Sequence, residues 1–208
     1  SHMGFVTLGL FTLNQTGIEG GILQMINHGV ITGALFLCIG MIYERTHTRM
    51  IEDYGGLSKT VPLFIVFFTV FTLAAIGLPG MNAFVGEFLI ISGAFKANMI
   101  IAAFSIFGVV LGVTYMVWLY YRVALNEINS NTKSSLFDLD SREIATLVPL
   151  VMLVFLIGVQ PEIVLSYMHA SVEHLVEQIH TAVPLDPNRI YNSVNLFVEY
   201  VKELLWWV

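Results

Sequence analysis

The sequence predicts an all-α protein: a polytopic bundle of transmembrane helices with one discontinuous helix and a C-terminal amphipathic helix. The first observation is a shortage of charge, because only 12% of the 208 residues are charged, whereas soluble domains carry about 25%. The second is a mean hydropathy of +0.78. This composition excludes a disordered chain, and a single cysteine excludes a disulfide-bonded scaffold. The excess of acidic over basic residues, 15 against 9, excludes a nucleic-acid-binding surface.

Four apolar tracts are long enough to cross a membrane as helices. A hydrocarbon core about 30 Å thick needs about 20 helical residues, and only backbone with internal hydrogen bonds is stable inside it. We expect the spans over residues 18–43, 61–95, 99–121 and 144–168. A shorter apolar stretch over 1–13 precedes them and lacks the basic segment and cleavage site of a signal peptide. We interpret this stretch as the end of a truncated helix.

The second tract contains Pro79 and Gly80, which we expect to break the helix near 78–82. The tract is then either one discontinuous span or two spans joined by a tight turn. With one span, the loops 44–60 and 122–142 lie on the same side and hold almost all the basic residues near span ends. With two spans, these residues are divided almost evenly. We therefore favour one discontinuous span, with the loop 44–60 cytoplasmic.

The pattern changes after residue 168, which divides the chain into a membrane domain over 1–168 and an interfacial tail over 169–208. From Ile190 the apolar residues recur on one helical face, and Trp206 and Trp207 suit a membrane–water interface. We expect this helix to lie on the membrane or a neighbouring subunit, or to pack on its own protein. The tail also holds residue types that can bind metal, which we interpret as a solvated polar face rather than a metal site. They are His169, Glu173, Glu177 and His180.

Glu87 is the one acidic residue in the middle of an apolar tract. An ionisable residue in a span is costly, and its default interpretation is functional. Glu87 follows Asn82 and the break by five residues, and an unwound segment can hold water and stabilise charge at membrane depth. We predict that Glu87 takes up and releases a proton; the alternative is a glutamate that only anchors its helix. Glu19, at a span end, is expected to reach water.

His28 is the basic candidate of the same kind, because it is mid-span and an imidazole titrates near neutral pH. Gln24, His28 and Thr32 are four residues apart, which places them in a polar stripe on one helical face. We predict that His28 transfers protons and that Gln24 and Thr32 support it. A histidine with a purely structural role is the alternative.

Five motifs follow one another along the chain: SHMGF at 1–5, QMINHG at 24–29, YERTHTR at 43–49, GGL at 55–57 and GLPGMNAFVGEF at 77–88. Together they closely resemble the subunit M family of proton-pumping NADH–quinone oxidoreductase, the respiratory complex I. The resemblance covers residues 1 to about 168, and it indicates that the first three residues are native sequence rather than the remnant of a purification tag.

The resemblance implies an antiporter-like subunit with two inverted repeats, each with a broken helix, that passes protons along a central polar axis. Glu87 matches the acid at the second broken helix, which implies the outlet to the periplasmic side, and His28 matches a histidine of the central axis. Sister subunits usually carry a lysine at the position of Glu87, so the glutamate points to subunit M. Some relatives carry a lysine at the position of Thr32, where the relay must differ here.

The family subunit is much longer, and its first half carries an acid–lysine pair and a central lysine that have no counterpart in this sequence. We therefore expect this chain to be the C-terminal portion of such a subunit. It would hold an outlet half-channel without the inlet, and we expect no pumping from it alone.

The resemblance implies a subunit of a redox-driven translocase that couples quinone reduction to proton pumping, with no catalytic redox centre in this chain. Expected partners are the lipid bilayer and other membrane-arm subunits, including sister antiporter-like subunits, without direct contact to NADH. We expect no cofactor here, FMN and iron–sulfur clusters belonging to other subunits, and a location in the bacterial inner membrane. The alternatives are a sodium/proton antiporter subunit and a non-conducting structural subunit.

Overall fold

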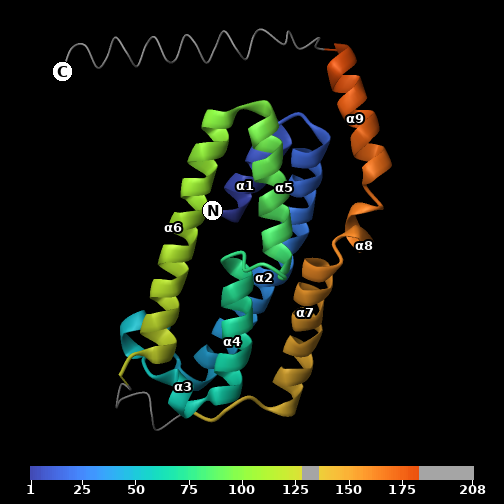
Figure 1. Ribbon diagram of the computed structural model, residues 1–208. Helices are drawn as coiled ribbons and strands as arrows, with labels where there is room; N and C mark the ends of the chain where they lie inside the picture. Colours follow the sequence, from blue (N-terminus) through green and yellow to red (C-terminus); the bar gives the residue numbers. More distant parts are fainter. Residues whose placement is uncertain (128–135, 183–208) are drawn as a thin grey trace, which may run out of the picture.

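The helix α2 (Gln15–Thr46) runs along the bundle from end to end in the computed structural model, which describes residues 1–127 and 136–182 (Figure 1). The shorter helix α1 (His2–Phe11) precedes α2 and packs against it. Asn14 starts α2 as its N-cap, because its side-chain oxygen accepts a hydrogen bond from the Gly17 amide at 3.0 Å. The short apolar stretch over 1–13 and the predicted span over 18–43 thus correspond to these two helices.

The broken helix consists of α4 (Pro62–Ala75) and α5 (Asn82–Ala97), which follow each other along the bundle (Figure 1). The prediction of a discontinuous helix is confirmed, but the break lies over 76–81 rather than 78–82. Gly77 ends α4 in the left-handed conformation, with φ of 72°. The amides of Gly77 and Leu78 then donate to the carbonyls of Ala74 and Leu73, both at 3.1 Å, a helix ending that comes before Pro79.

The helix α6 (Met99–Tyr120) returns along the bundle and continues into the π-helical turn η2 (Tyr121–Leu125). This turn lies at the same end of the bundle as the short helices η1 (Ile51–Asp53) and α3 (Leu57–Thr60) (Figure 1). The loop 44–60 and the segment after α6 therefore share one end, as a single discontinuous span requires. Lys133, one of the basic residues counted for this end, lies outside the described residues.

The last predicted span, 144–168, is wrong at its C-terminal end. The helix α7 (Ser141–Val159) stops early because Pro161 has no amide hydrogen to continue it. The short helix α8 (Glu162–Leu165) and the helix α9 (His169–Ala182) follow, and α9 extends past the bundle (Figure 1). The division at 168/169 stays a prediction, and the apolar face from Ile190 to the last tryptophans lies outside the described residues.

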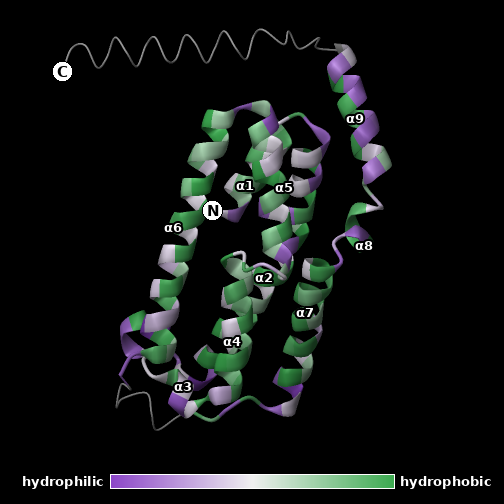
Figure 2. Cartoon of the chain, in the orientation of Figure 1, coloured by the Kyte–Doolittle hydropathy of each residue, from purple (hydrophilic) through white to green (hydrophobic). Residues whose placement is uncertain are grey.

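Three helices of the described chain are long and apolar enough to cross a membrane: α2, α6 with its continuation to Leu125, and α7. Figure 2 shows hydrophobic residues along most of α6 and α7, and hydrophilic ones at the lower turns and on α9. At that lower end, Arg45 of α2 forms an ion pair with Glu143 of α7 at 2.6 Å. Asp138 accepts hydrogen bonds from the amides of Leu63 and Phe64, which fixes the start of α4.

Candidate functional site at the helix break

Glu87 lies near the start of α5, against the turn that ends α4, and is only 8% exposed. One of its carboxylate oxygens, Oε1, is 3.4 Å from Nε2 of Gln24 and 3.7 Å from Nε2 of His2. The other oxygen, Oε2, faces Gly77, where an added Cβ would come within 3.0 Å of it. The carboxylate therefore has one side toward the broken backbone and one toward two polar side chains from α1 and α2.

A row of histidines leads away from Glu87. His2 is held by the Ala75 carbonyl, 2.9 Å from its Nε2, and its other ring nitrogen is 3.4 Å from Nδ1 of His28. Thr32 Oγ1 lies 2.9 Å from that same nitrogen of His28. These distances place Thr32, His28, His2 and Glu87 in one line of neighbouring polar groups.

A second group of polar side chains packs on the other side of Gln24. Asn27 donates to the Asn82 carbonyl at 2.8 Å and to the Gln24 side-chain oxygen at 3.3 Å. Gln24 can approach α5 because Gly86 has no side chain, and a Cβ there would clash with the Gln24 side-chain oxygen. Within the described residues, Oδ1 of Asn27 and both side-chain polar atoms of Asn82 are buried without a hydrogen-bond partner. Buried polar atoms of this kind usually bind ordered water.

The structure thus brings together most of the predicted site, namely Glu87, His28, Gln24, Thr32 and Asn82. Pro79 and Gly80 differ, because they lie on the exposed part of the turn, and a Cβ added at Gly80 would meet no atom within 4 Å. Pro79 and Gly80 are part of the break between α4 and α5.

The sequence pattern does not predict two members of this site, His2 and Asn27. His2 sits in a stretch too short to span, so hydropathy gave it no weight, and its only signal was the motif at 1–5. Asn27 lies in the motif 24–29, next to His28 but outside the stripe of Gln24, His28 and Thr32.

The expectation for Glu19 was wrong, because this residue is only 6% exposed. Its Oε1 lies 2.8 Å from Nδ1 of His169, and the other ring nitrogen of that histidine is 3.2 Å from Glu162. The returning helix α9 therefore covers Glu19. Across the described part of the chain, no group of three or more histidine, cysteine or acidic residues is placed to hold a metal ion.

The fold and the site define a class: membrane subunits with a discontinuous helix and a buried acid beside its break. Residues 1–114 match the model of the family described as "NADH:quinone oxidoreductase/Mrp antiporter, TM". The chain belongs to this family.

Within the family, two relatives similar to this chain are subunits of one redox complex. The chain is 46% identical over 180 residues to "NADH-quinone oxidoreductase subunit M" of Rhodobacter capsulatus, covering 86% of this chain and 35% of the relative. It is also 46% identical over 177 residues to "NADH-ubiquinone oxidoreductase chain 4" of Marchantia polymorpha, covering 85% and 36%. The resemblance to the subunit M family is confirmed, and the chain spans about a third of the length of these relatives.

Solved structures agree with the all-α membrane fold. Respiratory complex I from Thermus thermophilus contains a chain that matches with a TM-score of 0.80 and 34% identity, covering 85% of this chain and 37% of that one. The Mrp complex from Dietzia sp. DQ12-45-1b matches with a TM-score of 0.72 at 21% identity, covering 86% of this chain and 41% of that one, which shows a shared fold alone.

Proposed function

We propose that this chain is the proton-releasing part of a subunit M in a proton-pumping NADH–quinone oxidoreductase. The observation that supports this proposal is the line of contacts from Thr32 through His28 and His2 to Glu87, beside a broken helix. Quinone reduction takes place elsewhere in the complex, and it would drive protons along this mid-membrane axis. Glu87 is the last member of the line and the group that gives up the proton toward the outlet.

His2 has the geometry of a switch between two partners. Its Nε2 lies 2.9 Å from the Ala75 carbonyl and 3.7 Å from Glu87 Oε1. A small ring rotation exchanges the carbonyl for the carboxylate as hydrogen-bond acceptor. The ring would be held in the first position and would deliver a proton in the second, with His28 resupplying it from the central axis.

The amides and the turn would prepare the carboxylate for this exchange. Gln24 donates to Glu87 at 3.4 Å, a long contact that leaves the carboxylate free to exchange its hydrogen-bond partner. The unpaired atoms of Asn27 and Asn82 suit water molecules, which can carry a proton on from the carboxylate. A change of hydration or charge along the axis would then decide when Glu87 releases its proton.

The same proposal gives the chain an orientation and partners. The basic residues Arg45, Arg49 and Lys59 share one end of the bundle with Arg122, which favours a cytoplasmic loop 44–60 in a bacterial inner membrane. The outlet then opens on the opposite side. The partners would be other membrane-arm subunits, including sister antiporter-like subunits, and the redox cofactors, FMN and iron–sulfur clusters, would lie in other subunits.

The test replaces Glu87 in the assembled complex, reconstituted in vesicles. We expect Glu87→Gln to lower the number of protons moved per NADH oxidised while assembly stays normal, because glutamine keeps the shape and loses the exchangeable proton. Glu19→Gln is the matched control, since Glu19 is equally buried but lies off the line, and its stoichiometry should stay at the wild-type value. An unchanged stoichiometry in Glu87→Gln with normal assembly would overturn the outlet role.

A second variant tests the central histidine. We expect His28→Ala to slow coupled turnover more than quinone reduction measured with the proton gradient collapsed by an uncoupler. The reason is that His28 lies on the proton line, so its loss should affect the coupled route first. Equal losses in both assays would assign His28 a structural role.

The family description also names Mrp antiporters, so a sodium/proton antiporter subunit is the second candidate. The glutamate at position 87 favours the first candidate, because the subunits of these antiporters usually carry a lysine there. Measuring translocation with and without sodium ions separates the two: a dependence on sodium would favour the antiporter. If replacing Glu87 and His28 changes neither the proton flow nor the sodium flow, the chain is a structural subunit.

A further inference from the structure

Tyr43 and Arg49 belong to the motif at 43–49, yet the proton line does not involve them. Both line a cavity of about 490 Å³ near the C-terminal end of α2, at the end of the bundle that carries the loop 44–60. This volume is within the range of cavities that hold small organic ligands, about 300–1,000 Å³.

The walls of the cavity are largely apolar, and most of their side chains come from three helices and from the loop 44–60. Phe36 and Ile39 come from α2, Phe64 and Phe68 from α4, and Leu119 from α6. Phe64 and Phe68 are buried, whereas Phe36 and Ile39 are 67% and 43% exposed. The opening therefore has an apolar rim, which suits contact with lipid tails better than contact with water.

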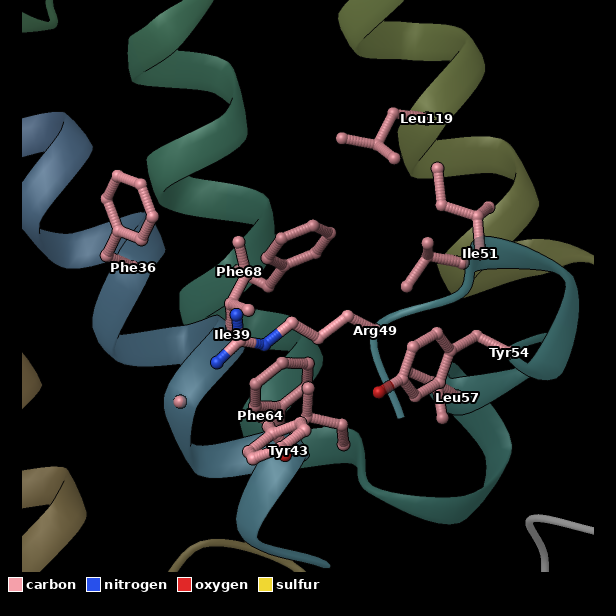
Figure 3. Close-up of a pocket in the computed structure, with 13 residues that line it drawn as sticks. Phe36, Ile39, Tyr43, Arg49, Ile51, Tyr54, Leu57, Phe64, Phe68 and Leu119 are labelled. Carbon is pink, nitrogen blue, oxygen red and sulfur yellow. The ribbon is translucent and has the colours of Figure 1, made fainter. Parts of the chain in front are cut away.

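Arg49 is the one charged residue in this lining. Figure 3 shows its side chain reaching across the cavity toward α2, and its guanidinium carbon lies 4.7 Å from the centre of the Tyr43 ring. Within the described parts of the chain, no carboxylate lies within ion-pair distance of this guanidinium. Arg45, four residues earlier, differs because Glu143 binds both of its Nη atoms, at 2.9 and 2.6 Å.

We propose that this cavity binds one acyl chain of an anionic phospholipid, with Arg49 paired to the phosphodiester. A guanidinium presents parallel N–H donors that match the oxygens of a phosphate. The cavity lies where the span α2 ends, which is the depth at which a lipid headgroup meets its tails. Charge complementarity selects a lipid over an uncharged occupant: a phosphodiester supplies a negative charge to pair with the Arg49 guanidinium, and a quinone headgroup supplies none.

The test uses the assembled complex in vesicles that contain phosphatidylglycerol with a photoactivatable group in one acyl chain. We expect cross-links on the α2 and α4 segments that line the cavity. Arg49→Gln should reduce this labelling about tenfold, because glutamine cannot form the charged hydrogen bonds to the phosphate. Lys59→Gln is the matched control, since it removes one exposed positive charge from the same loop without touching the lining, and its labelling should equal that of the wild type.

A further variant tests the apolar part of the site independently of charge. Gly40 lines the cavity, and a Cβ there would meet no atom within 4 Å. Gly40→Leu should therefore fold normally, fill the cavity and reduce labelling by a photoactivatable lipid of any headgroup. Together with loss of labelling in Arg49→Gln, this result would support the proposal.

Three outcomes would overturn the lipid site. The first is equal labelling of Arg49→Gln and the wild type. The second is equal competition by an uncharged isoprenoid quinone, which would assign the cavity to that ligand. The third is cross-linking of the cavity residues to another polypeptide in place of lipid. Because the readout is labelling, none of these outcomes depends on whether the chain moves protons.

Discussion

Two buried glutamates, Glu19 and Glu87, have similar surroundings and different geometry. They are 6% and 8% exposed, and each faces one glutamine amide and one imidazole. Glu19 has short contacts, 2.8 Å to both Gln15 Nε2 and His169 Nδ1. The corresponding contacts of Glu87, to Gln24 and His2, are 3.4 and 3.7 Å. The first carboxylate is held by normal hydrogen bonds, and the second is held loosely.

The two sites also lead in opposite directions. The side chain of His169 is 41% exposed and that of Glu162 is 71% exposed, so the contacts of Glu19 run outward to water. The contacts of Glu87 run inward, through His2 to His28. Burial alone therefore does not distinguish the two acids, whereas the loose contacts of Glu87 and the inward line of polar groups beside it do.

The largest expected effect comes from replacing the two histidines in turn. In the assembled complex, His2→Gln should lower coupled proton translocation by about tenfold or more, since loss of a positioned proton donor or acceptor costs about 10²–10⁴ in rate. His169→Gln should leave translocation near the wild-type rate. The measurement follows acidification with a pH-sensitive dye in vesicles while NADH is oxidised. Similar losses in both variants would show that the two glutamate sites do not differ in function.

The turn beside Glu87 offers a smaller and equally specific effect. Gly77 and Gly80 both have positive φ, 72° and 90°, so alanine at either position should lower stability by about 1–2 kcal/mol, measured by thermal unfolding of the complex. Only at Gly77 does the new Cβ approach Glu87 Oε2, at 3.0 Å; at Gly80 it meets no atom within 4 Å. Gly77→Ala should therefore also slow proton translocation, and Gly80→Ala should not.

If the two alanine variants slow translocation equally, strain in the turn rather than contact with the carboxylate controls Glu87. That result would weaken the distinction between the loosely held and the firmly held acid. It would leave the stability prediction intact, because both positions would still carry the same backbone strain.

Local patterns in the sequence predict the broken helix and Glu87 well. Pro79 and Gly80 interrupt an apolar tract, and Glu87 stands out because everything around it is apolar. The residue that ends α4 is Gly77, however, and its left-handed conformation depends on hydrogen bonds to Leu73 and Ala74 that composition does not reveal. Pattern alone therefore located the break to within two residues.

Contacts between distant segments could not be predicted in the same way. Glu19 lies near the start of α2, where a single helix in a bilayer would reach water, and it is buried because His169 returns 150 positions later in the chain. His2 contacts Glu87 because α1 packs beside α2 and α5, which hydropathy of a short segment does not indicate. Both misses concern which helices become neighbours.

The smallest expected effect concerns the docking of α9 through His169. The hydrogen bond with Glu19 raises the pKa of this histidine above its ordinary value, and Glu162 adds to the increase; these are the titratable groups that face it, from α2 and α8. A raised pKa in the docked state means that the protonated form docks more tightly. Docking is therefore strongest below the ordinary pKa of histidine, about 6.5, and weakens as pH rises through the raised value.

A spin label at position 175 (Leu175→Cys) should report a more mobile α9 as pH increases. His169→Gln should remove this dependence, and His174→Gln, on the same helix but exposed, should keep it. Unchanged mobility of α9 across the pH range would mean that packing rather than the imidazole holds Glu19. The two glutamates would then differ only in their distance to water.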